Sequence, residues 1–175
     1  MIASLAQPDR VDAQPIRADA SARPRRTTAA ARAPRPDEEV RPLRRLRPGA
    51  RGAGFVLIVD DAADTRELYA TYLDSRGFSA LTAPDGEVAI EMARRLRPDV
   101  IVMDLAMPRL NGIKATERLK RDPHTRRIPV IILTGYPYHA IQQGALEAGA
   151  EVFLTKPCLP EDLETHVRAL RKTRS

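Results

Sequence analysis

The chain has 175 residues, a length that suits one domain with a sizeable core plus a further segment. Hydrophobic residues make up 43% and charged residues 30%, and no apolar run approaches the ~18 residues that a membrane-spanning helix needs. The single cysteine, Cys158, excludes an internal disulfide and a cysteine-rich zinc site. We therefore expect a soluble, cytoplasmic protein that does not engage a membrane.

Most of the net charge of +6 lies in the first fifty residues. This segment is rich in arginine, alanine and proline, and its eleven arginines and six acidic residues, with no lysine, leave a net charge of +5. Its scattered apolar residues cannot offset the entropy of ordering it, so we expect residues 1–53 to form a disordered tail. The arginines could contact nucleic acid, but the tail has no aromatic residue to stack on bases, and we favour a simple extension.

From residue 55 onwards, apolar runs of strand length alternate with segments of helical period. Residues 55–59, 100–103 and 128–133 are continuous apolar runs, which are typical of strands buried on both faces in a parallel sheet. Weaker runs at 78–83 and 151–155 predict a second and a fifth strand. We therefore expect a five-stranded parallel sheet.

The intervening segments carry apolar residues at helical spacing. Three faces are predicted in this way: Leu68, Tyr69, Tyr72 and Leu73; Val88, Ala89, Met92, Ala93 and Leu96; and Leu159, Leu163, Val167 and Leu170. Five strands alternating with five helices over about 120 residues predict right-handed crossovers and a doubly wound α/β fold. Residues 54–172 would form this domain, and residues 173–175 its C-terminal end.

Polar residues stand at the ends of four predicted strands. Asp60 and Asp61 follow the first, Asp104 follows the third, Thr134 closes the fourth and Lys156 follows the fifth. In a doubly wound sheet the strand carboxyl ends border the ligand crevice, so these side chains should converge. Crowded carboxylates take up protons unless a cation neutralises them, and Mg²⁺ is the cation that prefers hard oxygen ligands. A carboxylate can attack phosphorus, and hydroxyl and ammonium groups bind phosphoryl oxygens, which indicates phosphoryl chemistry.

These motifs resemble the response regulator receiver domains of two-component signalling, the CheY-like family. The resemblance covers roughly residues 54–172 and rests on the joint spacing of several segments. The segments are Val59-Asp60-Asp61, Ala83-Pro84-Asp85-Gly86-Glu87, residues 98–108, Leu110-Asn111-Gly112, Leu133-Thr134-Gly135 and Phe153-Leu154-Thr155-Lys156-Pro157. The resemblance implies a flavodoxin-like sheet with the strand order 2-1-3-4-5.

The resemblance also implies roles for the acidic residues. Asp104 would be the phosphoacceptor, and Mg²⁺ would be held by Asp60, Asp61, Asp104 and the backbone carbonyl of Ala106. In this family, side chains at the positions of Ala106 and Tyr136 influence how the acyl phosphate meets water. A small apolar group at the first position and a bulky ring at the second predict a slowly hydrolysed phosphate.

Further roles carry over to the fourth and fifth strands. Thr134 and Lys156 would bind the phosphoryl group, and Phe153 looks like the aromatic switch residue of the family. Ordinary core packing is the competing interpretation for Phe153. The Lys156–Pro157 peptide bond would be cis, as is usual in the family.

These roles predict a non-enzymatic response regulator that accepts a phosphoryl group from a sensor histidine kinase or a histidine phosphotransfer protein. Only five residues follow Leu170, so we expect a stand-alone receiver that signals by a conformational switch to a downstream protein target. A phosphorylation-dependent homodimer is left open. The alternative is a receiver-fold interaction module that phosphorylation does not regulate. A haloacid-dehalogenase-like phosphatase is disfavoured, because the segment from Asp60 to Asp64 lacks the DxDx[TV] pattern.

Overall fold

The computed structural model describes residues 54–172. The predicted tail, residues 1–53, and the predicted C-terminal end, residues 173–175, lie outside the described residues. Within residues 54–172, no helix combines the length and the apolar character needed to span a bilayer.

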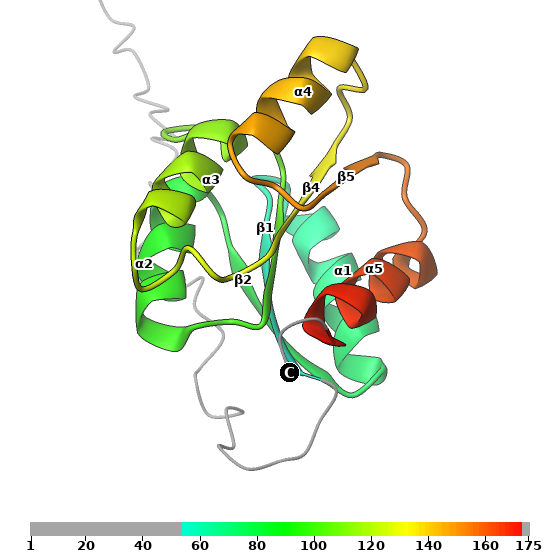
Figure 1. The fold of residues 1–175 in the computed structure, drawn as a ribbon. Helices are drawn as coiled ribbons and strands as arrows, with labels where there is room; N and C mark the ends of the chain where they lie inside the picture. Colours follow the sequence, from blue (N-terminus) through cyan, green and yellow to red (C-terminus); the bar gives the residue numbers. More distant parts are fainter. Residues whose placement is uncertain (1–53, 173–175) are drawn as a thin grey trace, which may run out of the picture. The chain divides into compact units, whose positions relative to one another are not determined.

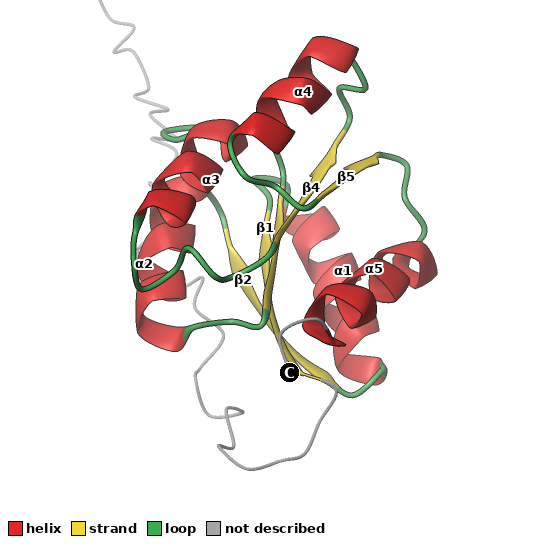
Figure 2. Ribbon diagram, viewed as in Figure 1, coloured by secondary structure: helices red, strands yellow, loops and turns green. Residues whose placement is uncertain are grey.

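Strands and helices alternate strictly along the chain (Figures 1 and 2). The elements are β1 (Gly54–Val59), α1 (Ala63–Ser75), β2 (Phe78–Ala83), α2 (Gly86–Leu96), β3 (Val100–Met103), α3 (Gly112–Arg121), β4 (Val130–Thr134), α4 (His139–Glu147), β5 (Val152–Thr155) and α5 (Pro160–Lys172). All four neighbouring strand pairs are parallel, and the order is β2-β1-β3-β4-β5. The predicted flavodoxin-like doubly wound sheet is therefore confirmed.

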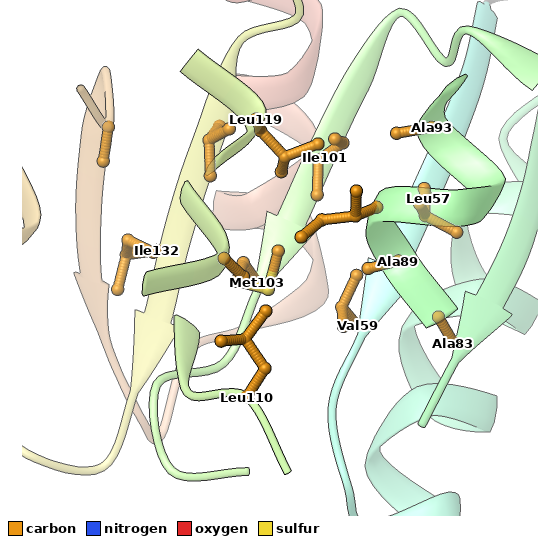
Figure 3. Packing of buried hydrophobic residues seen from close by; sticks show 14 of the residues in the cluster. Leu57, Val59, Ala83, Ala89, Ala93, Ile101, Met103, Leu110, Leu119 and Ile132 are labelled. Carbon is orange, nitrogen blue, oxygen red and sulfur yellow. The ribbon is translucent and has the colours of Figure 1, made fainter. Parts of the chain in front are cut away.

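Two apolar clusters cover the two faces of the sheet. Leu57 and Val59 of β1 pack on the side of α2, α3 and α4, whereas Val56 and Ile58 pack on the side of α1 and α5. Figure 3 shows the first cluster, in which side chains of β1, β3 and β4 meet α2 and α3. Residues alternate between the faces because successive side chains of a strand point in opposite directions. This two-sided burial is the reason that the strands appear as unbroken apolar runs in the sequence.

Strand β4 begins two residues later than predicted. Pro129 has no N–H to donate to the ladder, and the amide of Ile128 donates instead to the carbonyl of Thr125 in the preceding turn, at 2.8 Å. Ile128 is nevertheless fully buried, so the apolar run records burial rather than strand pairing. β5 similarly begins at Val152, one residue after the predicted start.

Two leucines predicted to face the core are exposed. Leu68 of α1 is 55% exposed, because the buried face of the helix runs through Arg66, Tyr69, Ala70 and Leu73. Leu159 is 65% exposed and precedes α5, where its carbonyl accepts the amides of Asp162 and Leu163. In both helices an apolar side chain next to the stripe was assigned to it from the sequence, because helical spacing defines a face only to within about one residue.

Candidate functional site

Two carboxylates and one ammonium group meet at the carboxyl edge of the sheet. Asp60 directly follows β1, Asp104 follows β3, and Lys156 follows β5. The Lys156 Nζ donates to Oδ2 of Asp60 at 2.6 Å and to Oδ1 of Asp104 at 3.0 Å. Both aspartates are almost fully buried, with 3% and 5% of their surface exposed. These two ion pairs bring together the residues that the sequence predicted at the ends of β1, β3 and β5.

The sheet register brings these residues together. Val59 and Met103, the last residues of β1 and β3, pair in the ladder, and so do Thr134 of β4 and Thr155 of β5. The ladder continues into the site, because the amide of Asp104 donates to the carbonyl of Val59 at 2.8 Å. β1 and β3 therefore end level with one another, and β4 and β5 end level two positions further on, since Met103 pairs with Ile132. All four strands run in the same direction, so the residues that follow them lie at one edge of the sheet.

A backbone amide orients each buried carboxylate. Oδ1 of Asp60 accepts the amide of Ala62 at 2.9 Å, and Oδ2 of Asp104 accepts the amide of Ala106 at 2.9 Å. In each aspartate the other oxygen accepts from Lys156. Both carboxylates are thus held on both oxygens, which restricts their rotation.

Burial and charge act against each other on Asp104. Desolvation raises the pKa of Asp104, and the nearby charge of Asp60 raises it further. The hydrogen bond and the charge of Lys156, and the amide of Ala106, lower this pKa, but the net pKa is above the ordinary value of 3.8. For Lys156, desolvation lowers the pKa, but its two carboxylate partners outweigh that effect and raise the pKa above 10.5. The lysine is therefore held charged between two crowded carboxylates.

The other predicted site residues border this centre. Asp61 is exposed beside Asp60, whereas the Lys156 ammonium forms its ion pairs with Asp60 and Asp104. Thr134 is fully buried, and its Oγ1 accepts the amide of Tyr136 at 3.2 Å. The amide of Lys156 donates to the carbonyl of Thr134 at 2.8 Å, which places the two residues side by side.

Three further predicted residues have distinct surroundings. Ala106 is exposed, and the ring of Tyr136 is 49% exposed. Phe153 on the edge strand β5 is half-buried and packs against the cluster shown in Figure 3. The Lys156–Pro157 bond is cis, as predicted. The positions of Ala106 and Phe153 are compatible with their predicted roles, which stay predictions.

The oxygen donors suit Mg²⁺ in the way that proteins usually bind it. Within residues 54–172, no three acidic, histidine or cysteine side chains are grouped so that they alone could hold a metal ion. Mg²⁺, however, usually keeps several waters and takes only one or two carboxylates together with phosphate oxygens. Asp60 and Asp104 supply two convergent carboxylates, and Asp61 adds an exposed one next to them. The residues present therefore fit the ion.

The sequence interpretation missed two arginines near the site. Arg66 of α1 is buried, and its guanidinium donates to the backbone carbonyls of Asp60 and Asp61. Arg109, which has a φ of 63°, forms an ion pair with the fully buried Asp85. Arg66 could have been noticed as a charged residue on the helical face of Tyr69 and Leu73. The ion pair between Arg109 and Asp85 joins residues 24 positions apart, so no local sequence pattern could have predicted it.

Asp85 is the N-cap of α2. Its Oδ1 accepts the amides of Glu87 at 2.8 Å and Val88 at 3.0 Å, which satisfies two donors at the start of the helix. Burial raises the pKa of Asp85, but the hydrogen bond from Arg109 and those from the two amides outweigh burial and lower it below 3.8. Asp85 therefore links the start of α2 to the loop that follows β3.

A doubly wound sheet with buried carboxylates and a lysine at its carboxyl edge is the architecture of a signal receiver. Residues 56–168 match the family model described as response regulator receiver domain. The chain therefore belongs to the response regulator receiver family of two-component systems. This family is a signalling module that is generally non-enzymatic, works with histidine kinases and downstream targets, and typically binds Mg²⁺ at acidic residues.

Curated relatives share about a third of their residues with this chain over the receiver region. The PhoB phosphate regulon transcriptional regulatory protein of Pseudomonas aeruginosa is 38% identical over 119 residues, which cover 67% of this chain and 52% of PhoB. The response regulator PleD of Caulobacter vibrioides is 38% identical over 117 residues, covering 67% of this chain and 26% of PleD. The chain thus spans about half or less of the length of these relatives.

Solved structures show the same fold. The Francisella response regulator 1452 receiver domain has a TM-score of 0.66 at 30% identity, covering 70% of this chain and 99% of that domain. The chemotaxis protein CheY4 of Vibrio cholerae has a TM-score of 0.63 at 29% identity, covering 66% of this chain and 97% of CheY4. These likenesses confirm the predicted family.

Proposed function

We propose that this receiver accepts a phosphoryl group on Asp104 and passes the signal on by a conformational switch in protein contacts. The observation that carries the proposal is the buried Asp104 carboxylate, which shares the Lys156 ammonium with Asp60. A buried carboxylate without a fixed counter-charge would be protonated and a poor nucleophile. Lys156 supports the ionised form that phosphoryl transfer requires.

Asp60, Asp61 and Asp104 would hold Mg²⁺ together with the backbone carbonyl of Ala106. When bound, the ion neutralises charge between the carboxylates and an incoming phosphate. One carboxylate oxygen of Asp104 forms the new bond to phosphorus while the bond between phosphorus and the donor breaks. The product is an acyl phosphate on Asp104, and the donor leaves with its electron pair.

Lys156 and Thr134 would bind the phosphoryl oxygens. Lys156 already touches Asp104, so its ammonium needs only a small displacement to contact a phosphoryl oxygen there. The Thr134 hydroxyl accepts the amide of Tyr136 and retains its own proton to donate. A shift of Thr134 towards the phosphate would carry the loop that contains Tyr136 with it.

The structure after β4 supports the proposed switch. Helix α4 has one buried residue, Ala145, so little packing free energy holds it against the sheet. Phe153 on β5 is half-buried and packs against the same cluster. Movement of the loop after Thr134 would thus repack α4 and Phe153, and a downstream protein would bind the altered surface.

The phosphoryl donor would be a sensor histidine kinase or a histidine phosphotransfer protein. The signal would pass to a downstream protein through contacts of the receiver domain. A homodimer formed on phosphorylation is one form that these contacts could take. The alternative is an interaction module that phosphorylation does not regulate, and the experiment below separates the two.

The test is incubation with a small-molecule phosphoryl donor and Mg²⁺, followed by intact-mass measurement. We expect the wild type to gain one phosphoryl group and Asp104→Asn to gain none, because the amide cannot act as the nucleophile. Removal of Mg²⁺ with a chelator should suppress the gain. Asp162→Asn, an exposed aspartate in the first turn of α5, is the matched control and should behave as the wild type.

Equal labelling of Asp104→Asn would assign the phosphoacceptor to another residue. A wild type that gains no phosphoryl group from several donors would favour the unregulated interaction module.

A further inference from the structure

Arg66 stands out because it is a buried cation. It is the one buried basic residue among residues 54–172, with 6% of its surface exposed. It lies on the face of α1 that also buries Tyr69, Ala70 and Leu73 against the sheet. Burial of a guanidinium is costly unless it is fully hydrogen-bonded, and an apolar side chain would suit this face better. The charge at this position therefore needs an explanation beyond packing.

The hydrogen bonds of Arg66 supply that explanation. Its Nη1 donates to the carbonyl of Asp60 at 2.6 Å and to that of Asp61 at 3.1 Å. Its own amide donates to the carbonyl of Ala62 at 3.1 Å. Arg66 thus hydrogen-bonds to the carbonyls of three consecutive residues, 60–62. These residues form the whole connection between β1 and α1 (Figure 1).

This connection carries the acidic pair of the site. The Asp60 carboxylate accepts the amide of Ala62 on one oxygen and Lys156 on the other. The backbone positions of residues 60–62 therefore decide where the carboxylates of Asp60 and Asp61 lie. A cationic guanidinium beneath these residues also offsets part of the repulsion between the crowded carboxylates.

We propose that Arg66 is a positioning residue of the receiver site, which holds the connection from Asp60 to Ala62 in the geometry that binds the divalent cation. The inference rests on the proposed function of that site. Arg66 acts through the backbone of the two aspartates and does not itself contact the cation or the phosphoryl group. Partners that orient metal ligands typically contribute roughly 10- to 100-fold to metal affinity.

The test compares Arg66→Met and Arg66→Lys with a matched control, Arg168→Met. Methionine keeps much of the apolar volume and removes the donors, whereas lysine keeps the charge and one donor nitrogen. Arg168 likewise pairs with a carboxylate, that of Glu164, and donates to a carbonyl, that of Arg76, at a place away from the site. Its loss controls for general destabilisation.

The first readout is the Mg²⁺ dissociation constant measured by titration calorimetry on the full chain. We expect it to rise about tenfold in Arg66→Met, with Arg66→Lys in between and Arg168→Met unchanged. The second readout is hydrogen exchange of the amide of Ala62 without Mg²⁺, which should be faster only in the Arg66 variants. In phosphorylation with a small-molecule donor, the half-saturating Mg²⁺ concentration should rise more than the maximal rate falls.

Wild-type Mg²⁺ affinity in Arg66→Met would overturn the inference, and so would an equal loss in Arg168→Met. If Arg66→Met does not fold, Arg66→Lys decides the question in the same assays. A wild type that neither binds Mg²⁺ nor takes up a phosphoryl group would overturn the proposed function itself, and this inference with it.

Discussion

Burial and charge have opposite effects on the pKa of Lys156. Desolvation lowers this pKa, but the two carboxylates raise it by more, so they stabilise the charged form of the lysine. The charged form of Asp104 is not stabilised in the same way, because desolvation outweighs the hydrogen bond from Lys156 and raises the pKa of Asp104. The site therefore holds a carboxylate in a place that disfavours its charge. A cation or a covalent phosphoryl group would relieve this disfavoured charge.

Ala106 and Tyr136 each contact a site residue through the backbone. The amide of Ala106 donates to the Asp104 carboxylate, and the amide of Tyr136 donates to the Thr134 hydroxyl. We therefore expect their side chains to border the place where water would approach an acyl phosphate on Asp104. The methyl group of Ala106 cannot hydrogen-bond to that water, and we expect the bulky ring of Tyr136 to slow its approach.

We predict that the acyl phosphate decays more slowly in the wild type than in an Ala106→Asn, Tyr136→Glu double variant. Introduced amide and carboxylate groups can position water, an effect that we expect to speed the decay by roughly tenfold or more. The measurement follows the loss of phosphoprotein after removal of the donor. Equal decay in the two proteins would contradict the prediction.

The junction between β3 and α3 is tightly packed at Gly112. A Cβ at Gly112, the first residue of α3, would overlap the carbonyl oxygen of Asp104 and press on the backbone of Leu105. The start of α3 therefore packs directly against the backbone of the phosphoacceptor. Gly135, after β4, has open space around the corresponding position, with nothing within 4 Å.

We predict that Gly112→Ala destabilises the domain by about 1–3 kcal/mol, because backbone atoms must move apart to admit the methyl group. Gly135→Ala, the matched control, should stay within about 0.5 kcal/mol of the wild type. Urea unfolding gives both free energies. Gly112→Ala should also take up the phosphoryl group more slowly, since the strain falls on Asp104. A fully stable Gly112→Ala would show that the junction is looser than it appears.

At the scale of the whole molecule, charge is divided between the two edges of the sheet. The acidic site lies at the carboxyl edge, whereas basic residues occupy the last turns of α2, α3 and α5 at the opposite edge. Cations in these positions stabilise the helices, because the carboxyl end of a helix carries a partial negative charge. On the α1 side, Glu164 of α5 ties the helices together by accepting from Tyr72 at 3.0 Å, Arg76 at 2.9 Å and Arg168 at 2.7 Å.

The buried carboxylates of Glu164 and Asp104 should contribute to the pH dependence of stability with opposite signs. Burial raises the pKa of Glu164, but its hydrogen bonds with Arg168, Tyr72 and Arg76 outweigh burial and lower it below 4.5. Glu164 thus stabilises the fold above its unfolded pKa and loses this effect as pH falls through its folded pKa. Asp104, with a raised pKa, costs stability as pH rises through the window between 3.8 and its folded pKa.

We predict that at neutral pH and without Mg²⁺, Glu164→Gln is less stable than the wild type by about 1–2 kcal/mol, in line with the loss of charged hydrogen bonds. Asp104→Asn should be more stable than the wild type under the same conditions. The Glu164→Gln difference should shrink as the pH falls from the unfolded pKa of Glu164 through its lower folded pKa. The Asp104→Asn difference should shrink as the pH falls from the raised folded pKa of Asp104 to 3.8, because the carboxyl is then neutral in both states. Urea unfolding across this pH range measures both, and an Asp104→Asn variant that is destabilised at neutral pH would refute the assigned sign.

The sequence alone determined the alternation of strands and helices and the positions of Asp60, Asp104, Thr134 and Lys156 at strand ends. Periodicity and strand length are local properties, and strands buried on both faces leave an unbroken apolar run. The strand order came from the resemblance to the receiver family, and the ladder confirmed it. The roles of Asp61, Ala106, Tyr136 and Phe153 came from the same resemblance and stay predictions.

Which charged side chains contact one another depends on the packing of the folded chain. Lys156 bonds to Asp60 across 96 positions, and Glu164 bonds to Arg76 across 88, distances at which sequence pattern carries no information. The burial of Arg66 and the exposure of Leu68 were likewise set by neighbouring elements. The late start of β4, by contrast, has a local cause, because Pro129 has no N–H to donate to the ladder. The physical reason is that hydrophobic period specifies a face, whereas the partners of a buried charge depend on how whole elements pack around it.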